Sequence, residues 1–205
     1  VRSDYVRDAY VSDLQNAAGG YAPHDTYVHL YLDGVYWGLY DVHERADDAF
    51  AASYLGGDET EYDCLKHDPA NIMSGDRVAW NAMMAAARKD LSADANYAAL
   101  RAWLDVPNFI DYMAVHFFVG NDDWDHHNWY ATHRRLPGEP FRIHSWDSEH
   151  VLKDVNINRL SLNNTDRPSE ICTRLRANPE FRLLFADRAH RLFFDGGPMY
   201  VDPAA

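Results

Sequence analysis

The sequence is poor in cysteine and in positive charge, and both shortages narrow the possible functions. Cys64 and Cys172 are the only cysteines among the 205 residues. Two cysteines this far apart form no zinc pattern, and they neither require nor exclude a disulfide. Lysine and arginine total 19 against 32 aspartates and glutamates, which gives a formal net charge of −13 at pH 7. Without a basic stripe to neutralise a phosphate backbone, we expect no nucleic-acid partner.

Long apolar runs and several common catalytic motifs are also missing. No apolar stretch approaches the roughly 18 residues of a membrane-spanning helix, so we expect no membrane span. The opening residues, VRSDYVRDAY, lack the apolar core of a signal peptide. They also lack an initiator methionine, as expected of a segment cut from a longer chain. The absence of a G-x-S-x-G elbow and of Walker or Rossmann glycine loops argues against those hydrolases and nucleotide-binding folds.

The pattern that is present predicts a single domain of the α+β class. Hydrophobic residues make up 47% and charged residues 25% of the chain, as in ordinary globular proteins. Strands come first, helices follow, and a hairpin interrupts the helical part. This order predicts a small sheet-rich part in residues 1–70 and a larger helical part in residues 71–205. We expect helices over residues 3–18, 47–55, 76–89, 93–104, 106–119, 168–177 and 179–194, and a short strand over Tyr62–Lys66.

The clearest local signal is a hairpin around Asp33-Gly34, a strong two-residue turn. It joins the strands Tyr27–Leu32 and Val35–Tyr40, and the second strand continues toward Glu44. Alternation predicts an apolar face that belongs to the core: Val28, Leu30, Leu32, Val35, Trp37 and Leu39. The opposite face is predicted to be an aromatic, partly polar surface: Tyr27, His29, Tyr31, Tyr36 and Tyr40.

The most informative stretch runs from Gly120 to Glu149, GNDDWDHHNWYATHRRLPGEPFRIHSWDSE. Pro137-Gly138 marks a turn between the strand-like runs Asn128–Arg135 and Pro140–Trp146. An antiparallel hairpin centred on that turn places Asn128 opposite Asp147. An amide oxygen and a carboxylate are then side by side, with further acids and histidines next to them. Such hard oxygen ligands suit a divalent cation and a phosphate group.

Phosphoryl transfer needs a base, metal ligands, and a cation on the phosphates that is positioned by an acid. Asp123 is the candidate base, and it precedes Asn128 by the spacing of the kinase catalytic loop. Asn128 and Asp147 are the candidate metal ligands. Lys66 is the candidate cation and Glu44 its partner. The sequence therefore indicates phosphoryl transfer.

Each of these residues also has a simpler interpretation. Lys66 could be a solvated surface lysine, and Glu44 an exposed acid or a helix N-terminal charge. Asp147 could cap a helix or pair with an arginine. The base could be Asp122, Asp123 or Asp125, and the choice depends on alignment to a motif. His126 and His127 suggest zinc, but adjacent residues in a strand point to opposite faces, so at most one would face a metal.

Several segments resemble the spore coat protein H (CotH) kinases, an atypical group with a protein-kinase-like fold. They are YVHLYLDGVYWGLYDVHE, the lysine of YDCLKH, NFIDYMAVHFFVGNDDWDHHNWY, FRIHSWDSEH and RLRANPEFRLLFADRAHRLFF. Together they follow the family order over essentially the whole chain. The GN-acid-His-Asn block followed by a Trp-Asp strand end is the specific part.

The resemblance implies phosphorylation of Ser or Thr in a protein substrate, with ATP and Mg²⁺ or Mn²⁺ as cofactors. It matches Asp123 to the catalytic aspartate, Asn128 and Asp147 to the metal positions, and Lys66 with Glu44 to the ATP-binding pair. It favours the spore coat, the cell envelope or the outside of the cell as the location. The acidic surface suits a basic, Ser-rich protein substrate, although acidity also serves solubility.

Two departures from the family affect this expectation. Family members carry an upstream segment that covers the nucleotide, so we expect an incomplete domain with weak ATP affinity. Glu149 stands where the family often has a second aspartate, which puts its role in doubt. Two rival functions remain: a metal-dependent hydrolase, which would need His126 or His127 as ligands, and a non-catalytic interaction protein with the same fold.

Overall fold

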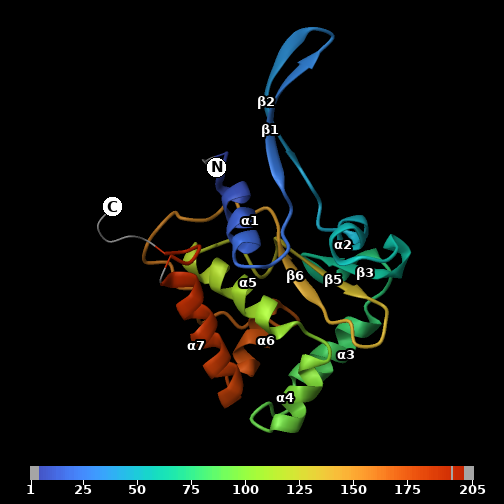
Figure 1. The fold of residues 1–205 in the computed structure, drawn as a ribbon, viewed down its shortest axis with the longest axis vertical. Helices are drawn as coiled ribbons and strands as arrows, with labels where there is room; N and C mark the ends of the chain where they lie inside the picture. Colours follow the sequence, from blue (N-terminus) through green and yellow to red (C-terminus); the bar gives the residue numbers. More distant parts are fainter. Residues whose placement is uncertain (1–4, 195, 201–205) are drawn as a thin grey trace.

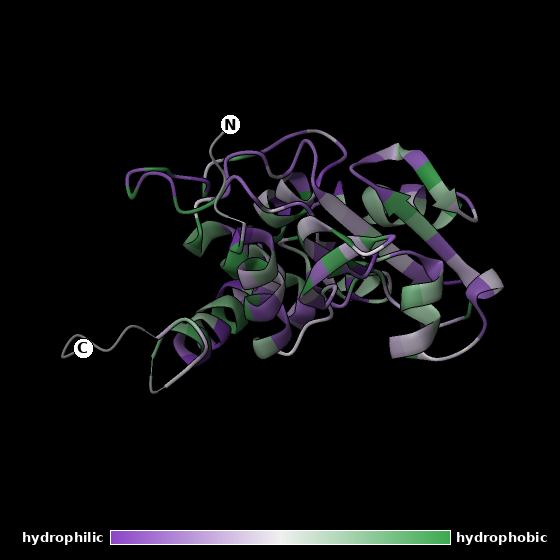
Figure 2. Ribbon diagram, turned by 90° about the horizontal axis from the view of Figure 1, so that it is seen from above, coloured by the Kyte–Doolittle hydropathy of each residue, from purple (hydrophilic) through white to green (hydrophobic). Residues whose placement is uncertain are grey.

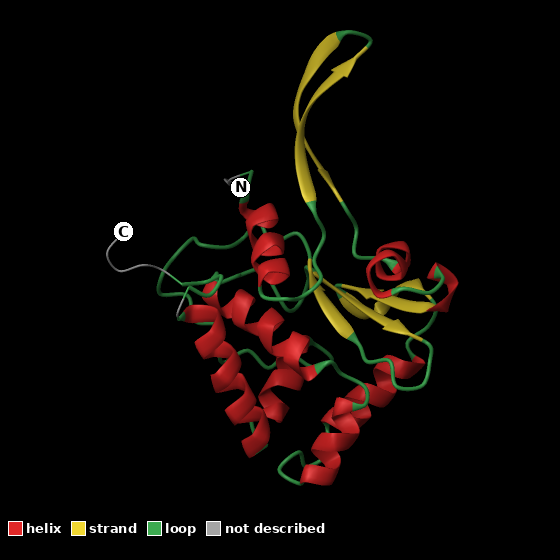
Figure 3. Cartoon of the chain, viewed as in Figure 1, coloured by secondary structure: helices red, strands yellow, loops and turns green. Residues whose placement is uncertain are grey.

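The computed structural model describes residues 5–194 and 196–200. Its helices are α1 (Arg7–Ala17), α2 (Asp48–Leu55), α3 (Val78–Ala87), α4 (Asp94–Arg101), α5 (Val106–Phe118), α6 (Pro168–Leu175) and α7 (Pro179–Phe193), with a short 3-10 helix, η1 (Glu59–Glu61). Its strands are β1 (Asp25–Leu32), β2 (Val35–His43), β3 (Tyr62–Lys66), β4 (Asp68–Ser74), β5 (Trp129–Arg134) and β6 (Arg142–Ser145). The architecture is α+β, with two antiparallel sheets and helices beneath the larger one (Figures 1 and 3).

The larger sheet has the strand order β4-β3-β5-β6. It crosses the expected division at residue 70, which falls inside β4, and it joins β3 directly to β5. The two expected parts of the chain therefore share one sheet.

No described helix is long and apolar enough to cross a membrane.

The register of the β5–β6 hairpin differs by one residue from the prediction. Trp129 pairs with Ser145, so Asn128 does not stand opposite Asp147 in the ladder. The connection is longer than a two-residue turn, and Pro140 has no N–H to contribute to a ladder. Asn128 also leaves the strand conformation, with a φ of 62°. The expected direct opposition was wrong.

Helix α5 is the centre of the core, as its apolar sequence predicts. The Asp105 side chain accepts from the N–H of Asn108 at its first turn, and Pro107 occupies that turn. The helix packs against α7, β6 and α1. Beside it, the Trp80 ring stacks on Trp129 with 5.4 Å between centroids. Figure 2 shows hydrophobic and hydrophilic residues mixed along the surrounding helices, as expected where one side of a helix is buried.

The β1–β2 hairpin forms as predicted, but neither of its faces belongs to the core. It projects from the rest of the molecule (Figure 1), and no residue of either strand is fully buried. A bulge at Leu30/Tyr31 pairs Tyr31 with Tyr36 but Leu30 with Gly38, so the predicted division into two faces fails beyond it. Trp37 is 61% exposed. Alternation indicates a strand but does not say what covers it.

We expect Asp111→Ala to lower the free energy of unfolding by about 3 kcal/mol. Asp111 on α5 is 0% exposed and accepts hydrogen bonds from Arg188 and Arg191 on α7. Its loss leaves both guanidinium groups without their shared carboxylate. Urea denaturation measures the change. Asp187→Ala, at an exposed position of the same helix α7, is the control. Equal free energies of unfolding for Asp111→Ala and Asp187→Ala would contradict the stabilising role of the Asp111–arginine contacts.

Candidate active site

Three segments meet at one end of the larger sheet. The loop after α5 leads into β5, the chain leaves β6 at Ser145, and β3 ends at Lys66. Lys66 pairs with Tyr130, and the N–H of His67 donates to the Trp129 carbonyl at 2.8 Å. The pairing of β5 with both neighbours thus brings residues 66–67, 123–128 and 147–150 together.

Asn128 connects the two carboxylate-bearing segments. Its Nδ2 donates to Asp123 Oδ2 at 3.1 Å and to the backbone oxygen of Asp147 at 3.0 Å. Both Asn128 and Asp147 have a positive φ, 62° and 51°, a conformation that Asn and Asp tolerate better than most residues. Since both amide hydrogens are used, Oδ1 of Asn128 is left as an acceptor that could bind a cation.

The geometry separates the three acids of the loop. Asp125 is buried and accepts from Ser169 and Asn164, so it anchors α6. Asp122 pairs with Lys153 at 3.2 Å and lies near His150. Asp123 alone among the three contacts Asn128, and its side chain is partly exposed. Asp123 is therefore the acid best placed to meet a substrate.

Asp147 lies among other acids. Burial raises the pKa of its carboxyl group, and the charges of Glu149 and Asp123 raise it further, against His150 and Lys66, which lower it. Crowded carboxylates disfavour their own ionised forms. A bound cation would remove that penalty, so these charges fit a divalent ion better than an empty site.

Lys66 lies over two aromatic rings. Its Nζ is 5.0 Å from the centroid of Trp146 and 5.3 Å from that of Tyr130. Burial and the charge of Arg45 lower the pKa of Lys66, whereas Asp147 raises it. The lysine therefore lies close enough to the candidate metal ligand Asp147 for their charges to interact.

The predicted pairing of Lys66 with Glu44 is not formed. Glu44 instead accepts from the N–H of His24 at 3.0 Å and from the Tyr54 hydroxyl at 3.0 Å. These bonds hold its carboxylate at the start of the hairpin. The expectation that Glu44 pairs with Lys66 was therefore wrong. The order of residues in the sequence does not show in which direction the Glu44 side chain points after the end of β2.

Sequence reasoning missed two residues at the site, His67 and Arg45. His67 Nδ1 accepts from the backbone N–H of Asn128 at 2.9 Å. Burial lowers the pKa of His67 to about 4, with Lys66 and His127 contributing; the ring is neutral near pH 7 and can accept this bond. Arg45 lies over Trp146 at 5.6 Å from its centroid. The sequence offered one signal for these residues, because His67 directly follows Lys66 and Arg45 directly follows Glu44.

A second group of possible metal ligands lies at the base of the β1–β2 hairpin. Ligand atoms of Asp25, Asp41 and His43 lie within 4.8 Å of one another. Asp25 pairs with His43 across the ladder, and Asp41 lies two residues before His43, so all three share a face. His43 Nδ1 is 2.7 Å from Asp25 Oδ1. These residues could also hold a cation.

A family model described as CotH kinase protein matches residues 3–193, nearly the whole chain. No curated protein matches the chain.

We expect the carboxyl group of Asp147 to titrate above its ordinary value of 3.8. A raised pKa in the folded state means that the folded chain holds this proton more tightly than the unfolded chain, so ionised Asp147 opposes folding above that pKa. Mg²⁺ should shift the midpoint to lower pH. Carboxyl ¹³C NMR measures it, and Glu149→Gln should lower it because one repelling charge is removed. A midpoint at or below the ordinary value, unchanged by Mg²⁺, would contradict this account.

Proposed function

The chain belongs to the CotH kinase family, and on that premise we propose that it transfers the γ-phosphoryl group of ATP to a serine or threonine of a protein. We further propose that its α+β fold is a protein-kinase-like one. The observation that carries the proposal is the bridge from Asn128 to Asp123 and Asp147. It joins the candidate base to the candidate metal ligands at a single residue.

Asp123 is the proposed base. One carboxylate oxygen is held by Asn128, and the other lies 3.3 Å from His126 Nε2. A partly exposed carboxylate oriented in this way can accept the proton of a substrate hydroxyl as the hydroxyl attacks phosphorus. His126 is itself exposed, so it would leave room for a polypeptide substrate.

Asn128 and Asp147 are the residues that would hold Mg²⁺ or Mn²⁺, through Oδ1 and the carboxylate. When bound, the cation would neutralise charge on the phosphate oxygens. Carboxylate and amide oxygens are the hard ligands such ions prefer. The chain itself orients both groups through the left-handed backbone of the two residues and the hydrogen bond between them.

Lys66 and Arg45 form the proposed phosphate-binding pair, and both lie close to the ring of Trp146. Their positive charges repel each other, and the charge of Arg45 lowers the pKa of Lys66. An anion bound between them would relieve that repulsion. Arg45 therefore supplements Lys66 at the nucleotide phosphates, while Glu44 takes no direct part.

A protein-binding role is the second candidate function, and one observation favours it. The projecting hairpin exposes Tyr31, Tyr36 and Trp37, and aromatic residues are enriched at protein interfaces. Nucleotide binding without turnover would favour this function. The hydrolase alternative has less support, because neither His126 nor His127 joins a cluster of three ligands among the described residues.

Incubation with γ-labelled ATP, Mn²⁺ or Mg²⁺ and a basic, Ser-rich acceptor tests the kinase proposal. We expect Asp123→Asn to reduce label transfer by about 10²-fold or more, since a positioned base contributes about that much. Asp147→Asn should abolish transfer by removing a charged metal ligand. Arg45→Gln should raise the KM for ATP more than it lowers kcat.

Asp187→Asn, at an exposed position of α7, is the matched control and should retain full transfer. Circular dichroism establishes that each variant is folded. Transfer that survives both Asp123→Asn and Asp147→Asn would overturn the assignment of the site. ATP-dependent thermal stabilisation without transfer would instead favour the protein-binding role.

A further inference from the structure

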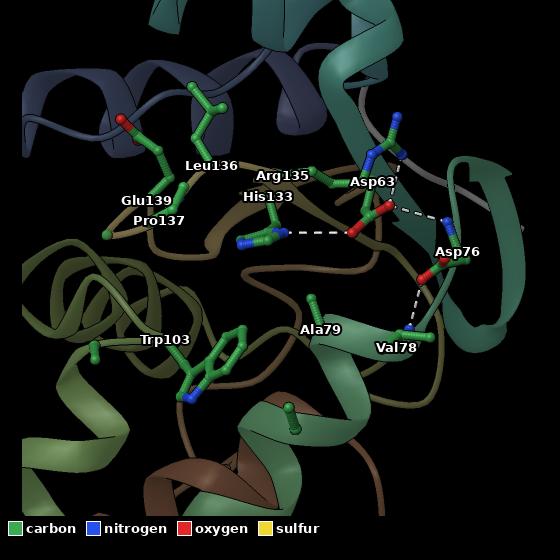
Figure 4. A pocket seen from close by; sticks show the side chains of 13 residues that line it. Asp63, Asp76, Val78, Ala79, Trp103, His133, Arg135, Leu136, Pro137 and Glu139 are labelled. Atoms are coloured by element: carbon green, nitrogen blue, oxygen red, sulfur yellow. Dashed lines mark hydrogen bonds and ion pairs between the residues drawn. The ribbon is translucent and has the colours of Figure 1, made fainter.

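A cavity of about 610 Å³ lies at the other end of β5, away from the candidate active site. His133 lies five residues after Asn128, which corresponds to about 16 Å along an extended strand. Most of its lining is apolar: Val78, Ala79, Ala82, Ala102, Trp103, Leu136 and Pro137. Figure 4 shows the polar residues on one side of it and the Trp103 indole on another. Nothing in the proposed phosphoryl transfer uses this cavity.

A buried aspartate and a histidine form the polar wall of the cavity. Asp63 and His133 are cross-strand partners on β3 and β5, and Asp63 Oδ2 lies 3.3 Å from His133 Nδ1. Asp63 Oδ1 accepts from Arg135 at 2.8 Å and from the N–H of Asp76 at 3.0 Å. Burial alone would raise the pKa of Asp63, but these hydrogen bonds outweigh it and keep the pKa below the ordinary value. Asp63 is therefore ionised, and its carboxylate accepts a hydrogen bond from the N–H at Nδ1 of His133.

Within the described part of the chain, the other ring nitrogen of His133, Nε2, makes no hydrogen bond to the protein. The side chain is only 7% exposed, and its ring stacks on Phe141 with 4.7 Å between centroids. Nε2 points away from Asp63, and the ring forms part of the cavity wall (Figure 4). In the tautomer that carries its proton on Nδ1, Nε2 is an acceptor. A ligand that donates to Nε2 would replace the solvent that reaches this atom in the open cavity.

We propose that this cavity binds a small, neutral aromatic molecule whose hydroxyl or N–H group donates to Nε2 of His133. The volume lies within the range of small-molecule sites and far exceeds that of a single water. The indole of Trp103 and the imidazole of His133 lie 6.2 Å apart, which offers aromatic contacts to a flat ring. The predominantly apolar lining makes any charged ligand costly.

The test compares 2-naphthol with 2-methoxynaphthalene, which lacks the donor, in titrations of the whole chain without nucleotide. We expect 2-naphthol to bind at least tenfold more tightly, which corresponds to about 1.4 kcal/mol and is typical of one buried hydrogen bond. It should also shift the ¹⁵N resonance of His133 Nε2. His144, whose two ring nitrogens already contact Thr132 and the Tyr21 carbonyl, should not respond.

Filling the cavity provides the matched variants. Ala82→Phe puts a ring into the lining and should abolish 2-naphthol binding, whereas Ala85→Phe, at an exposed position of the same helix α3, should leave it unchanged. Equal affinity for the two probes would overturn the role of His133. Binding that persists in Ala82→Phe, or no binding of either probe to the wild type, would overturn the site. Because no ATP is involved, these outcomes are independent of the kinase proposal.

Discussion

The pairing of β5 with a neighbour on each side is the constraint on which the rest of the structure depends. β3 and β6 both run antiparallel to it, so the end of β3 and the end of β6 meet at the start of β5. Lys66, Asn128 and Asp147 come from segments far apart in the chain, yet this register alone brings them together. The same pairing places Asp63 beside His133 at the opposite end. Polar residues thus gather at both ends of one strand, β5, whose residues Trp129 to His133 are buried.

Like charges lie close together at the candidate active site. Acids repel one another around Asp147, and two cations share the ring of Trp146. Each arrangement opposes folding by itself, and positive φ values at Asp125, Asn128 and Asp147 add backbone strain. A cation near the acids and an anion near Lys66 and Arg45 would relieve both repulsions together. A metal-bound nucleoside phosphate provides those two charges in one molecule.

Local signals predicted most of the elements, and the errors have physical causes. Asp33-Gly34 fixed the first hairpin, and the capping residue Asp105 fixed the start of α5. β4 was missed because DPANIMS has a proline and no apolar alternation, so only its pairing with β3 makes it a strand. Asn128 and Asp147 were chosen as candidate metal ligands from their spacing in the chain. The Lys66–Glu44 pair and the role of His67 depend on side-chain directions, which tertiary packing sets.

The burial of the hairpin could not be predicted, because exposure depends on neighbours and not on alternation. A two-stranded hairpin with no buried residues is marginally stable alone, so its anchorage at the base matters. There Asp8 lies 3.8 Å from His43 of β2, and its other oxygen accepts from the N–H of Ser148 at 2.6 Å. Burial raises the pKa of Asp8 to about 6, although the hydrogen bond from Ser148 and the charge of His43 lower it. Ser148 directly follows Asp147. The same carboxylate therefore contacts both the base of the hairpin and the backbone next to the proposed metal ligand.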